Sequence, residues 1–135
     1  VLAMHEAIRQ GAYEAILLNH RGELAECSQS NLFAVQDGVV LTPPLNAGLL
    51  EGVTRNFLFE VGADIGVPVR EAVLREADLE QVDELFITST TREVIPVVRV
   101  GDQAIGSGHP GPIAARLLAG FRNRANSLTR LTARA

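Results

Sequence analysis

The sequence Leu49-Leu50-Glu51-Gly52-Val53-Thr54-Arg55 leads directly into a helical pattern. Apolar residues recur at every fourth position from Val53 to Ile65, and this spacing predicts a helix over 53–65. Gly52 then lies where the helix N-cap should be, and the first N–H groups of a helix have no partner inside it. These groups and the helix dipole can bind an anion, and Thr54 adds a hydroxyl donor. The pattern is typical of a phosphate-binding turn, although an ordinary turn into an ordinary helix has the same composition.

The composition is that of one globular domain. The 135 residues include 47% hydrophobic and 21% charged residues, with a formal net charge of −4, and such a chain is long enough to bury a core. It has no run of 18 apolar residues, so we expect no membrane span. It also has no basic stripe and few aromatic residues, so nucleic-acid binding is not expected. The single cysteine, Cys27, excludes an internal disulfide and fits a reducing, cytoplasmic compartment.

Two features of the composition are unusual. All 12 of the Lys+Arg residues are arginine, so the sequence contains no lysine. It begins with Val1, within what reads as the body of a helix over 1–10, rather than with a methionine. We therefore expect the chain to be a piece of a longer protein.

The remaining pattern predicts short, mostly antiparallel strands with flanking helices. Asp37-Gly38 is a strong hairpin signal, Pro68 marks an edge strand, and Pro112 suits the first position of a last helix. Strands are expected over 14–19, 24–27, 32–35, 39–42, 67–73, 84–89, 94–100 and 103–105, with a short helical turn over 77–81. Residues 125–135 are weakly patterned, and we expect them to be disordered. The sequence thus predicts a mixed α/β (α+β) domain.

Three polar features interrupt this apolar background. Glu26 ends a predicted strand just before Ser28-Gln29-Ser30-Asn31, and a buried carboxylate needs partners, although these residues could equally cap a turn beside an outward-pointing Glu26. The turn at Gly52 is the second feature. The third is Thr88-Ser89-Thr90-Thr91 at the end of a strand. Threonine is a good strand former, but its hydroxyl also donates well to phosphate.

Together these features indicate a cofactor with an anionic end and a basic ring nitrogen. Pyridoxal phosphate has both. A carboxylate facing the pyridine nitrogen keeps it protonated, so that the ring accepts electrons from a substrate carbanion. The turn at Gly52 and the Ser/Thr run would hold the phosphate, and Leu50 is placed to pack on the ring face. No metal site is expected.

These motifs, in this order, resemble those of the class IV aminotransferases, the fold type IV pyridoxal-phosphate enzymes. The resemblance is carried by residues 14–19 leading to 26–33, 41–45 leading to 50–55, 71–72, 89–97 and 106–121. The family includes branched-chain aminotransferases, D-amino-acid aminotransferases and aminodeoxychorismate lyases. The resemblance implies the large, C-terminal domain of such an enzyme over residues 1–124, followed by a tail over 125–135.

The resemblance also implies a role for each matching residue. Glu26 would bind the pyridine nitrogen, Leu50 would pack on the ring, and Thr91 would touch the substrate carboxylate. Behind Glu26, Ser30 and Asn31 would hold it in place. The phosphate would be bound by Val53, Thr54, Ser89 and Thr90. Cys27 departs from the glycine usual in the family, and we expect it to crowd the backbone beside Glu26.

The implied activity is transfer of an amino group between an amino acid and a 2-oxo acid by a homodimer. In this family the Schiff-base lysine and a small N-terminal domain precede the helix that Val1 would continue. We expect both to be absent, which would leave the 135 residues inactive by themselves. Two alternatives stay open: a lyase that releases pyruvate from aminodeoxychorismate, and a non-catalytic domain that binds a phosphorylated ligand or a partner chain.

Overall fold

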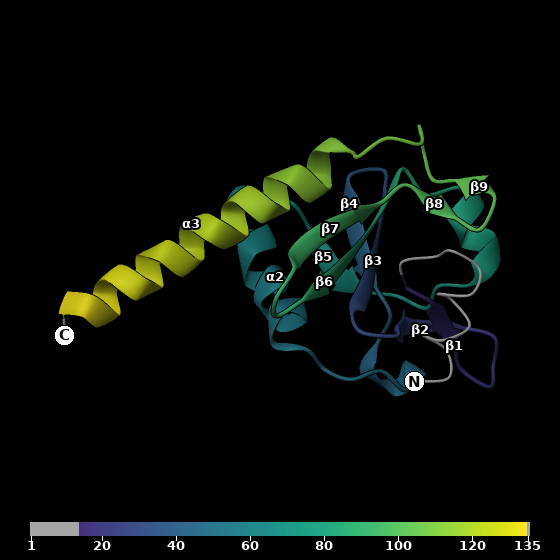
Figure 1. Cartoon of the computed structure of the whole chain (residues 1–135), viewed down its shortest axis with the longest axis horizontal. Coiled ribbons are helices and arrows are strands. Elements are labelled where there is room, and N and C mark those ends of the chain that lie inside the picture. Colours follow the sequence, from purple (N-terminus) through teal and green to yellow (C-terminus); the bar gives the residue numbers. More distant parts are fainter. Residues whose placement is uncertain (1–13, 135) are drawn as a thin grey trace.

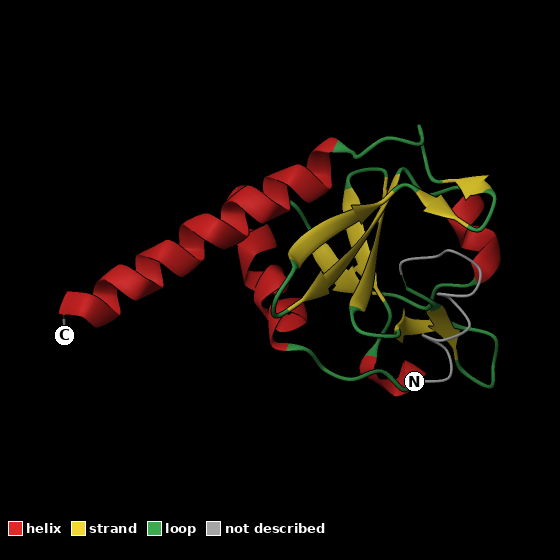
Figure 2. Cartoon of the chain, in the orientation of Figure 1, coloured by secondary structure: helices red, strands yellow, loops and turns green. Residues whose placement is uncertain are grey.

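The computed structural model describes the backbone of residues 14–134 and the side chains of residues 14–128. The helix expected over residues 1–10 lies outside the described residues. Figure 2 shows a body rich in strands, and Figure 1 shows α3 (Pro112–Arg134) running from that body to the C-terminal end. The fold is the mixed α/β arrangement that the sequence predicts.

The described part of the chain contains nine short strands. They are β1 (Ile16–Leu18), β2 (Leu24–Cys27), β3 (Asn31–Gln36), β4 (Val39–Thr42), β5 (Val69–Glu71), β6 (Glu84–Ser89), β7 (Glu93–Val97), β8 (Arg99–Val100) and β9 (Gln103–Ala104). The helices are α2 (Val53–Ile65), α3, and the short 3-10 helices η1 (Leu45–Ala47) and η2 (Glu76–Glu80). No helix among the described residues is long and apolar enough to cross a membrane.

A five-stranded sheet in the order β5-β4-β3-β6-β7 forms the centre, with β1–β2 and β8–β9 as separate pairs. Strands β4 and β5 run parallel, and the other neighbouring strands are antiparallel. The predicted hairpin turn is confirmed, because Asp37 (φ 53°) and Gly38 (φ 78°) both take the positive φ that a two-residue turn needs. Strand β5 lies at an edge of the sheet, as Pro68 predicts.

The two faces of the central sheet carry separate hydrophobic clusters. On one face, α2 and α3 cover Phe33 and Phe86, whose rings stack with their centroids 5.0 Å apart. On the other face, the β1–β2 pair and η2 cover Leu32 and Ile87. Successive side chains of a strand point to opposite faces, so β3 and β6 contribute to both clusters. Packing on both faces therefore holds these two strands, and their ends carry the polar residues of the candidate site.

A buried carboxylate anchors the start of α3. Glu84 accepts hydrogen bonds from the backbone N–H groups of Ile113 (2.9 Å) and Ala114 (3.0 Å). Gly111 permits this approach, because a side chain at that position would collide with the Glu84 carboxyl group. A negative charge at a helix N-terminus is favourable, and it satisfies N–H groups that the helix itself leaves unpaired.

Three expectations about the elements are wrong. The strand expected over 94–100 is divided at Val98, whose carbonyl instead accepts a hydrogen bond from the N–H of Ile105. Of the strand expected over 67–73, only residues 69–71 form a strand, which is β5. Residues 125–134 continue α3 instead of forming a disordered tail, because alanine, leucine and arginine favour helix there and Arg124 binds Glu60 and Asp64 of α2.

We expect Glu84→Gln to lower the free energy of unfolding by about 1–2 kcal/mol, because the amide has no charge and only one acceptor for two helix N–H groups. Urea denaturation followed by circular dichroism measures this loss. Glu80→Gln is the matched control, since Glu80 is exposed at the end of η2, and its effect should stay within about 0.5 kcal/mol. Equal stabilities for the two variants would show that Glu84 does not anchor α3.

Candidate functional site

The main chain of Leu50 is held by two polar side chains from different strands. Its N–H donates to Oε1 of Glu26 on β2 at 2.9 Å. Its carbonyl oxygen accepts from Nδ2 of Asn31, the first residue of β3, at 2.8 Å. The Leu50 side chain itself is 76% exposed. The two bonds therefore fix the backbone in a position that presents an apolar side chain to solvent next to a carboxylate.

The N-terminus of α2 begins beside this arrangement. Gly52 is the N-cap in an extended conformation (φ −75°, ψ 148°), and no side chain of the described residues caps the helix there. A Cβ at Gly52 would collide with Oδ1 of Asn31, so the close approach requires glycine. The first N–H groups of α2 thus lie close to Asn31 without a capping partner, which is the arrangement that binds anions.

Two predicted phosphate ligands belong to this first turn. Thr54 is buried, whereas Val53 is 79% exposed. Of the residues in the apolar pattern, the helix buries Leu58 and Val61 and leaves Val53 exposed. Binding through the backbone N–H of Val53 does not depend on its side chain.

The Ser/Thr run lies at the end of β6 and in the turn that follows. Thr88 is 2% exposed and is the cross-strand partner of Asn31. Its Oγ1 has no hydrogen-bond partner among the residues that the structure describes. Thr90 and Thr91 are exposed in the turn, while Ser89 Oγ accepts from the backbone N–H and Nε of Arg92. A buried hydroxyl without a partner is costly, so Thr88 is a further candidate donor beside Asn31.

The structure brings some of the residues predicted from the sequence together. Glu26, Asn31, Leu50 and the start of α2 are in contact. Ser30 was expected to hold Glu26, but its hydroxyl donates to Oε2 of Glu14 at 2.6 Å and accepts from Arg92 at 2.8 Å. Sequence reasoning missed these two charged partners, because they lie 16 and 62 positions away from Ser30 along the chain.

Arg55 is a second buried charge that sequence reasoning missed. It is 2% exposed, and its Nη2 donates to the carbonyl of Pro43 at 3.0 Å and to Oε2 of Glu71 at 2.7 Å. A buried guanidinium is stable only when it is paired and hydrogen-bonded. These bonds connect α2 to the segment before η1 and to β5, so they fix the direction in which the helix N-terminus points. The signal available in the sequence was an arginine directly after Thr54.

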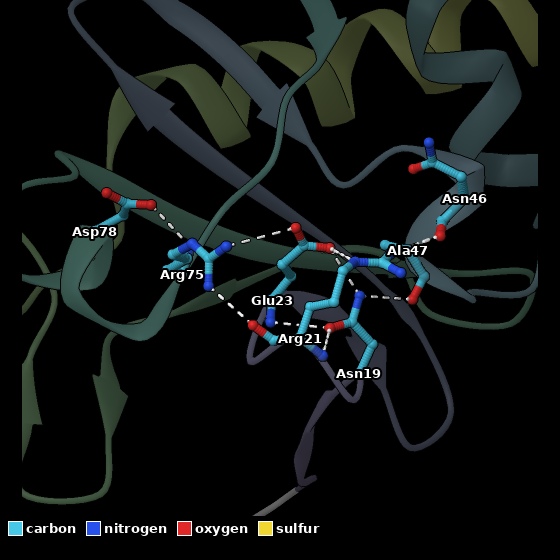
Figure 3. Close-up of polar contacts among 7 residues, drawn as sticks. All are labelled: Asn19, Arg21, Glu23, Asn46, Ala47, Arg75 and Asp78. Carbon is cyan, nitrogen blue, oxygen red and sulfur yellow. Dashed lines mark hydrogen bonds and ion pairs between the residues drawn. The ribbon is translucent and has the colours of Figure 1, made fainter.

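A network around Glu23 ties the turn after β1 to η1 (Figure 3). Asn19 Nδ2 donates to Glu23 Oε1 at 2.9 Å and to the carbonyl of Ala47 at 3.1 Å. Arg21 donates to the same Glu23 oxygen at 2.9 Å and to the carbonyl of Asn46 at 3.0 Å. The residues of η1 lead directly to Leu50, so this network supports the loop that carries Leu50.

The same network extends to η2. Arg75 lies 3.6 Å from the second carboxylate oxygen of Glu23 and donates to the carbonyl of Arg21 at 2.9 Å. Its backbone N–H donates to Asp78 at 2.8 Å (Figure 3). An open cleft of about 390 Å³ lies beside the network and is lined by Glu26 and residues 46–48, among others. Glu26 therefore borders open space, whereas residues 50–54 and 88–91 do not line this cleft.

The expected crowding of the backbone beside Glu26 by Cys27 stays a prediction. The Cys27 side chain is buried in the hydrophobic cluster with Leu24 and Leu32. Burial and the nearby charge of Glu14 raise the pKa of the Cys27 thiol to about 12. The thiol is therefore protonated at neutral pH and acts as a small apolar group rather than as a nucleophile.

The Glu23 network predicts a specific pH dependence of stability. Hydrogen bonds from Asn19 and then Arg21 hold the pKa of Glu23 below its ordinary value of 4.5. A lowered pKa stabilises the fold above pH 4.5, and this stabilisation is lost as the pH falls through the folded-state pKa. We expect wild type to unfold at a higher urea concentration than Glu23→Gln at neutral pH, with the difference shrinking below pH 4.5. A difference that stays constant down to the acid transition would contradict this role.

Comparison with known proteins places this geometry in context. A family model described as "Amino-transferase class IV" matches residues 1–100. The D-alanine aminotransferase of Listeria monocytogenes is 42% identical over 118 residues, which cover 87% of this chain and 40% of that protein. The branched-chain-amino-acid aminotransferase of Escherichia coli K12 is 37% identical over 121 residues, which cover 90% of this chain and 39% of that protein. The chain thus spans about 40% of the length of these relatives.

Solved structures agree with the sequence comparisons. The branched-chain amino acid aminotransferase of Escherichia coli superposes with a TM-score of 0.87 at 37% identity, over 90% of this chain and 40% of that one. The branched-chain aminotransferase of the thermophilic archaeon Thermoproteus uzoniensis, solved with norvaline, gives a TM-score of 0.84 at 35% identity. The superposition covers 90% of this chain and 40% of that one. At these identities the likeness extends beyond the fold to the family.

Proposed function

This chain belongs to the class IV aminotransferase family. We propose that the polar residues around Leu50 and the start of α2 hold pyridoxal 5′-phosphate, in an enzyme that transfers an amino group between an amino acid and a 2-oxo acid. The observation that carries the proposal is the Leu50 main chain held between Glu26 and Asn31 at the uncapped start of α2. This arrangement places a carboxylate, an exposed apolar side chain and an anion-binding helix end next to one another.

Each of these groups suits one part of the cofactor. We assign the pyridine nitrogen to the Glu26 carboxylate and the ring face to the Leu50 side chain. We assign the phosphate to the N–H groups of Val53 and Thr54 and to the Thr54 hydroxyl. Short donors of this kind bind phosphate without any need for a lysine.

The turn after β6 supplies the remaining proposed donors. Ser89 Oγ accepts from Arg92, so its own proton remains available for a phosphate oxygen. The exposed hydroxyl of Thr90 is a second donor in this proposal, and Thr91 would touch the substrate carboxylate. The unpaired Thr88 hydroxyl supports a polar occupant on this side of β6.

When bound, pyridoxal phosphate supplies an electron sink for the α-carbon of the substrate. The chain's own contribution is to keep a proton at the ring nitrogen through Glu26, and to orient the ring through Leu50 and the phosphate through α2. The sequence contains no lysine, so we propose that the amine that attaches the cofactor and moves the α-proton comes from outside these 135 residues. The relatives are named as aminotransferases, which favours transfer over the elimination of a lyase.

The proposal includes the organisation of the whole protein. We infer that residues 1–124 belong to the large cofactor-binding domain of a cytoplasmic homodimer. Leu18, Leu45 and Val73 are large apolar side chains that the described structure leaves exposed, and a packing partner would cover such surface. The protonated, buried thiol of Cys27 fits a reducing compartment.

Titration with pyridoxamine 5′-phosphate tests this function, because that form of the cofactor needs no lysine for attachment. We expect wild type to bind it. Thr54→Val should weaken binding about tenfold, since it removes one hydrogen bond to a charged group. Glu26→Gln should weaken binding at neutral pH, because it removes the partner of the protonated ring nitrogen.

Glu80→Gln is the matched control for Glu26→Gln, because it makes the same chemical change on the exposed surface of η2. Its affinity should equal that of wild type. The proposal fails if wild type does not bind the ligand, or if the Glu26 and Thr54 variants bind it as tightly as the control does.

A further inference from the structure

We propose that Arg92 is a positioning residue for the phosphate end of this site: paired with Glu14, it fixes the β6–β7 turn that presents Thr90 and Thr91. This inference rests on the proposed function and adds to it two residues that were not among the predicted ligands. Arg92 would not touch the ligand itself, but would act through the turn that its contacts hold in place.

Arg92 makes close polar contacts with the side chains of Glu14, Ser30 and Ser89. Its Nη2 lies 2.6 Å from Oε2 of Glu14 and donates to Ser30 Oγ at 2.8 Å. Its Nε and backbone N–H donate to Ser89 Oγ at 3.2 and 3.1 Å. Ser89 and Arg92 enclose Thr90 and Thr91, so the bonds to Ser89 close the turn upon itself, while the bonds to Glu14 and Ser30 attach it to the rest of the fold.

The Glu14 carboxylate is the other half of this attachment. Its side chain is 4% exposed. Besides Arg92, it accepts the N–H of Gln29 at 2.8 Å and the hydroxyl of Ser30 at 2.6 Å. A buried ion pair with its remaining positions hydrogen-bonded is strongly coupled. The pair therefore joins three segments that are distant in the sequence: the segment before β1, the β2–β3 turn and the β6–β7 turn.

Two of these segments adjoin or carry the proposed ends of the ligand site. The β2–β3 turn follows Glu26, the proposed partner of the ring nitrogen, and immediately precedes Asn31. The β6–β7 turn carries the proposed phosphate donor Thr90. Arg92 bridges the two turns, so its contacts set the separation between the nitrogen end and the phosphate end of a bound ligand.

The conformation of the turn shows why it needs such support. Glu93, directly after Arg92, has φ 58°, in the left-handed region that costs about 1 kcal/mol for a residue with a side chain. Thr90 and Thr91 are exposed and do not anchor the turn by burial. The side-chain bonds from Arg92 therefore add to the β6–β7 pairing, in which Ser89 lies opposite Glu93, and help to hold this exposed turn in one conformation.

The test compares pyridoxamine 5′-phosphate with pyridoxamine, which lacks the phosphate, in direct binding titrations. Arg92→Gln should reduce the preference for the phosphate form by about tenfold, a typical loss when a residue that orients a ligand-binding group is removed, while pyridoxamine binds as before. General loosening of the fold would instead weaken both ligands equally. The ratio of the two affinities therefore separates positioning from a merely structural role.

Arg122→Gln is the matched control, because Arg122 pairs with Glu93 on β7 at 3.0 Å but contacts neither Ser89 nor Ser30 in the described structure. The ratio of its affinities for pyridoxamine 5′-phosphate and pyridoxamine should equal that of wild type. The double variant Glu14→Gln/Arg92→Gln removes the ion pair without leaving a buried charge. It replaces the single variant in the titrations if Arg92→Gln fails to fold. We expect the double variant to show the same reduced ratio.

The outcomes separate this inference from the function on which it rests. If wild type does not prefer the phosphate form, the proposed function fails, and the inference fails with it. If wild type prefers it and the variants that lack Arg92 keep the full preference, the inference alone is overturned. An equal loss of affinity for both ligands also overturns it, because Arg92 would then only stabilise the fold.

Discussion

The two hydrogen bonds that hold the main chain of Leu50 connect the parts of this structure that matter for function. Glu26 reaches Leu50 from β2, and Asn31 reaches it from β3. Asn31 also lies against Gly52, so the same side chain fixes where α2 begins. A loop that would otherwise cross the end of the sheet freely is thereby bound on both sides. The carboxylate, the exposed leucine and the helix N-terminus have one relative arrangement as a result.

Buried charges at other points of the fold restrict how the helices can move. Arg55 holds α2 to Pro43 and Glu71, and Glu84 holds the start of α3 to β6. A buried charge is tolerated only with partners, so each of these groups specifies a single position for the element that it binds. The cost is visible at Arg55, whose Nε has no hydrogen-bond partner among the described residues. Rigid support of this kind is what a site needs if its donors are to meet a ligand without rearrangement.

The sequence predicted those parts of the fold that depend on neighbouring residues. The helical period of apolar residues located α2 together with its glycine N-cap, and Asp37-Gly38 located the hairpin. The three polar features were also recognised, because carboxylates and hydroxyls stand out in apolar surroundings. What the sequence could not predict depends on contacts between distant residues, as in the bonds of Ser30 to Glu14 and Arg92.

The first turn of α2 departs from the apolar pattern in a way that bears on function. Val53 belongs to the repeat of apolar residues, but its side chain is exposed, whereas Thr54 and Arg55 after it are buried. Periodicity describes the middle of a helix, where both faces have neighbours, and it says little about a first turn. Here the first turn is the part that faces the proposed phosphate, so the departure from the pattern occurs at the candidate site.

The most direct test of this account is the protonation state of the ring nitrogen in bound ligand. Pyridoxamine 5′-phosphate labelled with ¹⁵N in the ring reports that state through its nitrogen chemical shift. If the hydrogen bond to Leu50 places the Glu26 carboxylate at this nitrogen, the bound ligand should remain protonated at a pH where the free ligand has lost its ring proton. A bound ligand with the shift of neutral nitrogen at that pH would contradict the arrangement of the site proposed for this chain.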